Sequence, residues 1–149
     1  MATVDRTFTV NAKPAVVFAY LTDPEKATLW QSSLVEAQLE PEGPLRAGTQ
    51  IHEVRKLLGR RMESTVDVTE LEPEHVFAGH VRAGPVPWRF RYRFEESGES
   101  TRIELHMEGE PGGFFRVAEP LVVRTVEKQL ESDFATLKQL VESGESGDG

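Results

Sequence analysis

The chain has 149 residues, a formal net charge of −8 and no cysteine. This length is typical of one domain with its own hydrophobic core. The absence of cysteine excludes disulfides, zinc–thiolate sites, iron–sulfur clusters and cysteine nucleophiles. The acidic balance disfavours nonspecific nucleic-acid binding, which normally needs a basic surface. Because neither a membrane span nor a signal peptide is visible in the sequence, we expect a cytoplasmic protein.

The first 30 residues predict a strand followed by two short helices. Residues 3–10 alternate between apolar and polar side chains, with Arg6 on the apolar side. Pro14 suits the first position of a helix, and Asp23-Pro24 interrupts that helix. We expect a second short helix that ends near Trp30.

The middle of the chain predicts strands, and its end predicts one long helix. The expected strands are residues 33–40, 50–57, 62–70, 76–82, 88–95 and 102–108. Because no helix-length segment separates them, they favour an antiparallel sheet. The helix, at 120–142, has an apolar stripe of Val122, Val126, Leu130, Phe134, Leu137 and Val141. We expect one domain over residues 1–142 and a disordered acidic tail over 143–149.

Turn positions predict which side chains share a face of the sheet. In the last hairpin we set Phe94 opposite Ile103. One face of that hairpin is then apolar, with Trp88, Phe90, Tyr92 and Met107, and the other is ionic. In the hairpin around Gly59 we set Leu57 opposite Met62, and in the 33–40 strand we place Val35, Ala37 and Leu39 on one face.

The apolar face of the sheet and the apolar stripe of the helix are predicted to pack against each other. Each must bury its apolar side, and each is the available partner of the other. A strongly curved sheet does not touch a straight helix along its whole length, so we expect a cavity between them.

Candidate site residues follow from this arrangement. Trp88 and Tyr92 are the best wall candidates because each has an apolar body and a polar tip, whereas Phe77 and Phe94 favour plain core. Glu53 and Arg55 lie on the inward parity in our register, which indicates a polar end of the cavity. The alternative is a register error or a bulge that turns both outward.

Two aromatic residues after Gly112-Gly113 have two interpretations. Phe114 and Phe115 form either a lid over the cavity or a hydrophobic staple at the helix start.

The histidines offer little catalytic or metal-binding signal. His52, His80 and His106 take the outward parity, and His75 follows Pro73 in a loop. No pair has helical metal-ligand spacing, and no phosphate loop, dinucleotide fingerprint or nucleophile elbow is present. We therefore expect neither a metal nor a cofactor.

Five features of the chain form a recognisable pattern: FTVNAKPAVVFAYLTDPEKATLW (8–30), Gly48-Thr49 with Gly59-Arg60, VTELEP (68–73), the run WRFRYRF with TRIEL, and the terminal helix. Together they resemble the START-like or SRPBCC superfamily, nearest to its polyketide cyclase/dehydrase-type branch. The resemblance implies an α+β helix-grip fold: a curved antiparallel sheet of about seven strands wrapped around a long C-terminal helix, with two short helices after strand 1. It places Trp30 at the pocket rim. Members bind lipids, sterols, hormones, polyketides or quinones, and some bind chaperones.

Three functions remain open. The leading one is binding of a small hydrophobic molecule, which is polyketide-, lipid- or isoprenoid-like, in the cavity between sheet and helix. Its expected contacts are Trp30, Glu53, Arg55, Trp88, Phe90, Tyr92, Met107, Phe114, Phe115, Val122 and Val126. The alternatives are a cofactor-independent polyketide cyclase/aromatase or dehydratase, whose catalytic residues are not identified, and a chaperone-activator-like interaction module. We expect no nucleic-acid partner, and a homodimer is compatible with the sequence.

Overall fold

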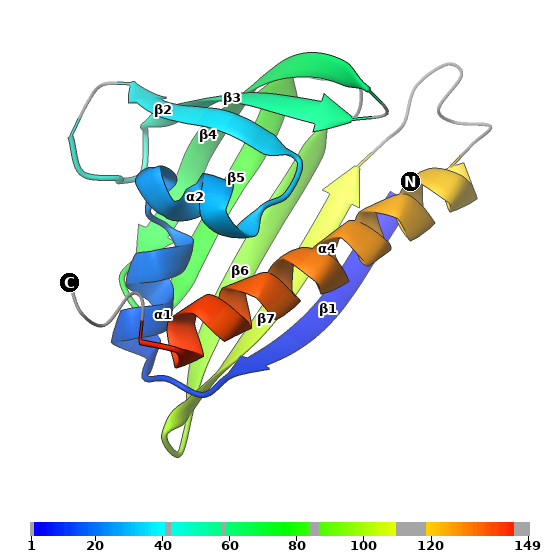
Figure 1. The fold of residues 1–149 in the computed structure, drawn as a ribbon. Coiled ribbons are helices and arrows are strands. Elements are labelled where there is room, and N and C mark those ends of the chain that lie inside the picture. The colour runs from blue at the N-terminus through cyan, green and yellow to red at the C-terminus, as the bar shows by residue number, and fades with distance from the viewer. Residues whose placement is uncertain (1, 41–42, 58, 84–86, 110–118, 145–149) are drawn as a thin grey trace.

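A computed structural model describes residues 2–40, 43–57, 59–83, 87–109 and 119–144 (Figure 1). Its elements are β1 (Ala2–Val10), α1 (Pro14–Leu21), α2 (Pro24–Trp30), β2 (Leu34–Glu40), β3 (Gln50–Leu57), β4 (Arg60–Glu72), β5 (Val76–Ala83), β6 (Trp88–Ser97), β7 (Ser100–Gly109) and α4 (Glu119–Glu142).

The strands form one antiparallel, strongly curved sheet in the order β1-β7-β6-β5-β4-β3-β2. Figure 1 shows α1, α2 and α4 on the concave side of this sheet, with α4 running diagonally in front of β1. The curvature carries β2 and β3 over the top of the concave side. The predicted α+β architecture is therefore confirmed, including the two short helices after the first strand and the long helix at the end.

The two short helices begin where the sequence predicts. Each starts with a proline, Pro14 in α1 and Pro24 in α2, where the missing N–H is not needed. The carboxylate of Asp23 caps α2 by accepting a hydrogen bond from the Glu25 N–H at 2.9 Å. Because α2 packs against β2, its last residue, Trp30, points into the core and is 3% exposed.

The two hairpins differ in how well their register is predicted. In β6–β7, Phe94 opposes Ile103 and Tyr92 opposes Leu105, as expected. In β3–β4, Leu57 opposes Arg60 rather than Met62, so the predicted register is wrong by two residues. The turn is tighter than expected because Gly59 adopts a φ of 77°, which favours glycine.

The register error leaves the faces of the sheet unchanged. Side chains alternate with a period of two, so a shift of two residues returns each to its predicted face. Glu53 consequently opposes Ser64, and Arg55 opposes Met62. A one-residue error would have reversed both faces.

The shared face predicted for Val35, Ala37 and Leu39 does not hold at Val35, because only Ala37 and Leu39 pack against the core. The β2–β3 pairing passes from Leu34–Arg55 directly to Glu36–Val54, so a β-bulge leaves Val35 without a partner residue. Its side chain is 45% exposed, whereas that of Leu34 is 5% exposed. The position of a bulge depends on how two strands pair, so alternation along one strand does not predict it.

The apolar stripe of α4 is buried unevenly along its length. Phe134, Leu137 and Val141 are buried in the C-terminal half, whereas Val126 and Leu130 are only half-buried. The helix contacts β1, α1 and α2. It therefore seals the fold at its C-terminal half and packs more loosely toward its N-terminal half.

Arg6 occupies an inward position of β1 without leaving a charge unpaired. Its Nη2 lies 3.2 Å from a carboxylate oxygen of Glu127 and 3.7 Å from one of Glu131, both on α4. The interruption of the apolar pattern at Arg6 therefore marks the place where the helix lies over the first strand.

Candidate functional site

The concave face presents a continuous group of aromatic side chains around Tyr92. Its ring is stacked on Phe77 at 5.8 Å and is tilted or edge-on to Phe90 at 5.7 Å and Phe94 at 6.3 Å. From the opposite side, Phe134 of α4 lies 6.1 Å from the Tyr92 ring. Tyr92 therefore lies where the sheet and the long helix meet.

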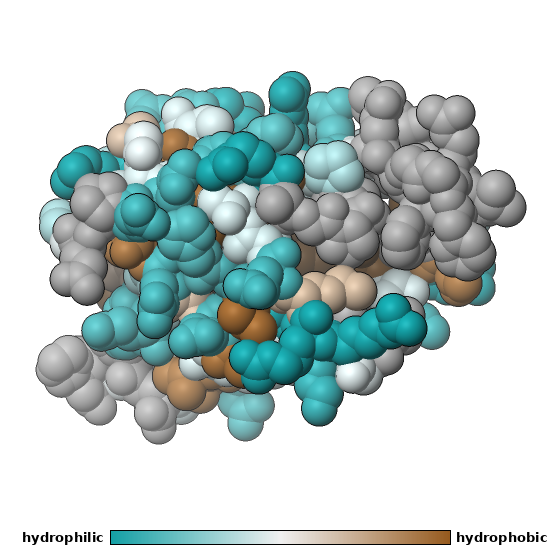
Figure 2. Space-filling model, turned by 90° about the horizontal axis from the view of Figure 1, so that it is seen from above, coloured by the Kyte–Doolittle hydropathy of each residue, from teal (hydrophilic) through white to brown (hydrophobic). Residues whose placement is uncertain are grey.

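Several inward residues of this face are not sealed from solvent. Phe90, Tyr92 and Met107 are half-buried, whereas Phe77 and Phe94 are buried as core residues. Met107 packs in the same cluster as Val126 and Leu130, the half-buried residues of α4. Figure 2, a view onto the β2–β3 side, shows a mainly hydrophilic exterior with smaller hydrophobic areas.

Arg55 is the centre of a polar cluster on the same inner side. Its Nε donates to Glu53 Oε1 at 3.1 Å, its Nη1 to Ser33 Oγ at 2.9 Å, and its Nη2 to Gln31 Oε1 at 2.6 Å. The Arg55 side chain is 26% exposed and that of Glu53 is 11% exposed. The pair is thus largely removed from water and held by polar partners.

Asp133 is a buried carboxylate that our sequence reasoning missed. It is 5% exposed and accepts hydrogen bonds from Ser32 N at 3.1 Å, Ser32 Oγ at 3.3 Å and Gln129 Nε2 at 2.9 Å. A signal was present, because Asp133 falls at helical spacing between Leu130 and Leu137. An acidic residue inside an apolar stripe indicates a buried polar contact.

The connection between α2 and β2 joins the two polar groups. Gln31 and Ser33 bind Arg55 of β3, while Ser32 between them binds Asp133 of α4. Neighbouring residues thus face opposite sides of the connection. The connection between α2 and β2 therefore links β3 to α4 through hydrogen bonds on both of its sides.

Charged groups of the interior act on the pKa of the Tyr92 phenol. Burial raises the pKa of the Tyr92 phenol, Arg55 opposes that change, and the carboxylates of Glu53 and Asp133 reinforce it. The phenol is therefore protonated at neutral pH, and its O–H is able to donate a hydrogen bond. Among the described residues, the Tyr92 hydroxyl has no hydrogen-bond partner.

The tryptophans lie at two different places in this interior. Trp30 packs edge-on to Phe134 at 5.3 Å, and within the described parts of the chain its buried Nε1 has no acceptor. Trp88 is 9% exposed and belongs to a smaller cluster with Val4, against which Val126 packs. Of the remaining predicted contacts, Phe114, Phe115 and the side chain of Val122 lie outside the described residues.

Two surface depressions lie away from Tyr92. One, of about 280 Å³, lies beside the start of α1 with Phe94 at its base. The other, of about 240 Å³, lies over β2, β3 and β4, and its lining includes Glu53 together with outer-face residues such as Glu36 and His52. Neither is lined by Tyr92 or Arg55, so the interior cavity expected from the sequence stays a prediction.

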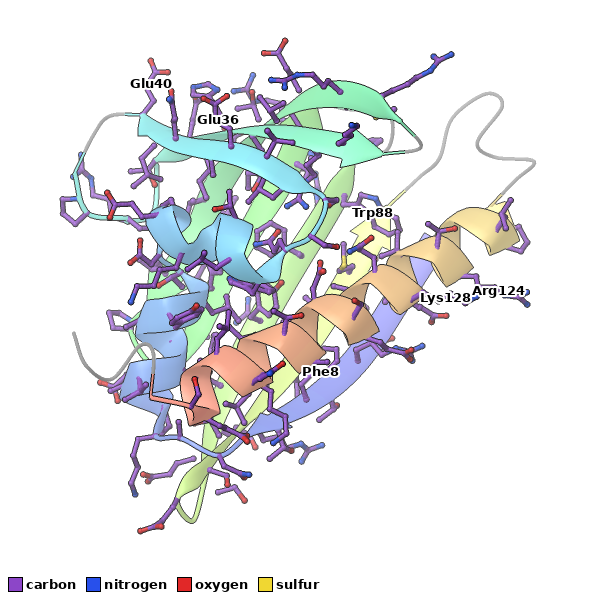
Figure 3. All side chains as sticks on the ribbon, in the orientation of Figure 1. Phe8, Glu36, Glu40, Trp88, Arg124 and Lys128 are labelled. Atoms are coloured by element: carbon purple, nitrogen blue, oxygen red, sulfur yellow. The ribbon has the colours of Figure 1, made fainter. Side chains whose placement is uncertain are left out.

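The charged side chains of the outer surface point away from the site. Figure 3 shows Glu36 and Glu40 projecting outward from β2, and Arg124 and Lys128 on the outward side of α4. The ring of His52 lies 2.6 Å from Glu40 on that outer side. Among residues 2–40, 43–57, 59–83, 87–109 and 119–144, no group of at least three His, Cys, Asp or Glu could hold a metal ion.

His106 on the outer face makes stability depend on pH. Its Nδ1 lies 2.5 Å from Asp5 Oδ1 and its Nε2 3.1 Å from Glu108 Oε2, and these contacts raise its pKa above the ordinary value. A raised folded-state pKa stabilises the protein below about pH 6.5 and ceases to do so as pH rises through the folded-state value. We expect the melting temperature of the wild type to exceed that of His106→Gln by more at pH 5.5 than at pH 8.5.

Differential scanning fluorimetry at both pH values measures this effect. The Asp5→Asn variant should lose most of the pH-dependent difference, and 1 M NaCl should reduce it in wild type by screening. An equal stability gap between wild type and His106→Gln at both pH values contradicts the role given to this histidine.

The structure is a helix-grip fold. Its concave side carries a group of aromatic side chains and the polar cluster around Arg55. The sequence profile of the family described as "Polyketide cyclase / dehydrase and lipid transport" matches residues 1–142. The chain belongs to this family, which confirms the resemblance to the START-like or SRPBCC superfamily. Membership supports a ligand-binding or cyclase role.

Solved structures of several organisms share the fold. TTHA0849 of Thermus thermophilus has a TM-score of 0.81 and 18% identity, covering 95% of this chain and 98% of its own. The Zhui aromatase/cyclase of Streptomyces sp. R1128 has a TM-score of 0.79 and 16% identity, covering 95% and 94%. A START superfamily protein of Mycobacterium smegmatis has a TM-score of 0.78 and 16% identity, covering 96% and 99%. At these identities the likeness shows the fold alone.

Two further searches found no match. No curated protein matches the sequence significantly. Within the described part of the chain, no helix has the length and apolar character needed to cross a bilayer.

Proposed function

We propose that this protein binds a small, mainly apolar molecule noncovalently between the concave face of the sheet and α4. The observation that carries the proposal is the polar cluster of Arg55 and Glu53 on the same inner side as the aromatic group around Tyr92. A protein that needed only a stable core would not require charged groups there, since buried charges are costly. The half-buried state of Phe90, Tyr92 and Met107 supports access by a ligand.

The ligand is of polyketide, lipid or isoprenoid type. Its apolar surface leaves water at roughly 25 cal/mol per Å², before the costs of association. The proposed walls are Trp30, Trp88, Phe90, Tyr92, Met107, Val122 and Val126, and the proposed polar end is formed by Glu53 and Arg55. Phe114 and Phe115 are proposed to cover the opening.

A polyketide cyclase or dehydratase is the second candidate, and the family description favours it. In that reaction Tyr92, which is protonated, donates a hydrogen bond to a ketone oxygen of the bound chain, and Glu53 is the nearby base. We expect Tyr92→Phe and Glu53→Gln to lose turnover of a poly-β-ketone while retaining its binding. Unchanged turnover in both variants contradicts this residue assignment.

The chaperone-activator-like alternative has less support. It requires a filled interior and a continuous exposed apolar patch. The large hydrophobic residues exposed among the described ones, Leu29, Val35 and Leu121, belong to three different elements. Their distribution favours the binding proposal.

Native mass spectrometry of the purified full-length chain tests the proposal, followed by solvent extraction of any bound molecule. In parallel, the neutral dye Nile red should bind with a blue-shifted emission and be displaced by farnesol. We expect Arg55→Met to weaken the binding of a co-purified oxygen-bearing ligand, and the matched outer-face control Arg93→Met to leave it unchanged. Absence of both a bound mass and dye binding contradicts the proposed function.

A further inference from the structure

We propose that Gly79 and Gly109 determine how wide a ligand the interior site accepts, because they let the rings of Phe90 and Trp88 lean across the sheet instead of standing up from it. This inference rests on the proposed function and adds the residues that set the shape of its ligand. It follows from the reason why these two positions hold glycine and from where they lie beneath α4.

Gly79 and Gly109 differ from the other described glycines. The others have a positive φ and open space where a Cβ would lie. Gly79 and Gly109 lack such a φ, and the positions of their Cβ atoms are crowded instead. Glycine weakens a strand unless a bulge or the close approach of another group requires it. The crowding is therefore the reason for glycine at these two positions.

Aromatic rings of the neighbouring strand cause most of this crowding. A Cβ on Gly79 would lie 2.7 Å from Cζ and 2.9 Å from Cε1 of Phe90, its partner in the β5–β6 pairing. A Cβ on Gly109 would lie 2.8 Å from Cε3 and 3.0 Å from Cδ2 of Trp88, its partner in the β6–β7 pairing. Each ring thus leans over a glycine of the next strand. A larger residue there would push the ring away from the sheet and into the interior.

The two glycines lie in the part of the concave face where α4 packs most loosely. Gly79, Phe90 and Met107 form one row across β5, β6 and β7, and Trp88 and Gly109 belong to the next row. Trp88 lies beside the N-terminal half of α4 (Figure 3). The helix residues that pack there are only half-buried: Val123, Val126 and Leu130.

The row on the other side of Phe90 has no glycine. It consists of Phe77, Tyr92 and Leu105. The ring of Phe134, which is 2% exposed, closes this row from above at 6.1 Å from the Tyr92 ring. The rings therefore lie low against the sheet only where the helix above them is loosely packed, and this is the place for the widest part of a ligand.

The two leaning rings suit a flat ring compound. Trp88 and Phe90 are successive inward residues of β6, so they are about 7 Å apart along the strand. A planar system of fused rings covers that distance and stacks on aromatic side chains in offset arrangements. A single open chain covers less of the same surface. Among the ligand types proposed above, ring compounds are thus favoured over chains.

Equilibrium dialysis with two alcohols of equal carbon number tests the inference. The probes are 2-anthracenemethanol, which is flat, and farnesol, which is an open chain. We expect the full-length wild type to bind the anthracene alcohol more tightly than farnesol. Gly79→Ala should weaken the anthracene alcohol by about tenfold, the usual effect of one carbon in a close-fitting apolar pocket, and farnesol by less than about twofold. Addition of Phe90→Leu to Gly79→Ala removes the clashing ring atoms and should restore part of the loss.

Gly98→Ala is the matched control. Gly98 lies in the turn between β6 and β7 with a φ of 63° and open space at its Cβ position, so alanine there strains the backbone without filling the site. It should lower stability and leave the ratio of the two affinities unchanged. An aromatic ring over a glycine also stabilises an antiparallel sheet. If that were the whole role of Gly79, the Gly79→Ala variant would behave like Gly98→Ala.

Gly109→Ala tests the second ring independently. In a Trp30→Phe background, the emission of Trp88 should change in this variant, together with weaker binding of the anthracene alcohol. Tighter wild-type binding of farnesol, or an unchanged affinity ratio in both folded alanine variants, overturns the inference and leaves the proposed function intact. Failure of both variants to fold, checked by circular dichroism, overturns it as well, because a ring with open space above it would move aside. Binding of neither alcohol by the wild type contradicts the proposed function itself.

Discussion

Replacement of Arg55 by methionine is expected to lower the free energy of unfolding by about 2–4 kcal/mol. Glu53, which is 11% exposed, would lose its counter-charge, and Ser33 and Gln31 would lose a donor. An uncompensated charge in a largely buried position costs more than the intact pair contributes. Urea unfolding followed by far-UV circular dichroism measures the difference.

A double variant and a surface control make this prediction specific. Glu53→Met combined with Arg55→Met should recover part of the loss, because the unpaired carboxylate is then removed as well. On the outer face, Arg91 pairs with Glu70 at 2.6 Å, but the side chains are 47% and 35% exposed. Arg91→Met should therefore cost less than about 1 kcal/mol. Equal losses for Arg55→Met and Arg91→Met would contradict the interior placement of the Arg55 pair.

Replacement of Phe134 by alanine is expected to destabilise the protein by about 3–5 kcal/mol. Phe134 is 2% exposed, and its ring is stacked on Phe8 at 4.0 Å while it also contacts Trp30 and Tyr92. Its removal leaves a void at the point where α4, β1, α2 and β6 meet. Such a void costs free energy because its lining atoms lose their contacts and the surrounding structure relaxes only partly.

Unfolding midpoints and tryptophan emission check this second prediction together. Truncation of Leu121, which belongs to the same helix but is 64% exposed, should change stability by no more than about 0.5 kcal/mol. In a Trp88→Phe background, the emission of Trp30 should shift to longer wavelength in the Phe134→Ala variant. A loss below about 1 kcal/mol would show that Phe134 is not the contact that joins the helix to the sheet.

Regular patterns made most of the fold predictable. The β6–β7 register follows from strict alternation on both strands, since only one register places Phe90 and Tyr92 on a single apolar face. The apolar stripe of α4 was predictable in the same way, from apolar residues at helical spacing. Both patterns are local consequences of side-chain geometry, so they survive without knowledge of the tertiary contacts.

Details that depend on backbone pairing were not predictable in the same way. The tight turn at Gly59 and the bulge at Val35 both change register without disturbing the pattern along their own strands. The turn shifted the register by two residues and left the faces intact, whereas the bulge turned Val35 outward. Which register has the lower free energy depends on the contacts with the partner strand.

The candidate site shows the same division. The parity of Glu53 and Arg55 predicted inward charges, with a register error or a bulge that turns both outward as the alternative. Their partners Gln31 and Ser33 were not, because the connection between α2 and β2 has no repeating pattern to indicate its contacts. Asp133 had a pattern, but its significance depends on which residues lie opposite the helix.

By itself, the sequence predicted one α+β domain with an apolar sheet face and a matching helix stripe, and the resemblance to a known superfamily added the helix-grip type. Alternation and helical spacing are sufficient for the sheet face and the stripe, since they follow from local geometry. Only the tertiary structure decided that Arg55 of β3 and Asp133 of α4 bind neighbouring residues of the connection between α2 and β2, and that Phe134 of α4 lies against Tyr92 of β6. These residues are far apart in the chain, and strand pairing and helix packing, which bring them together, are long-range interactions that no local pattern encodes.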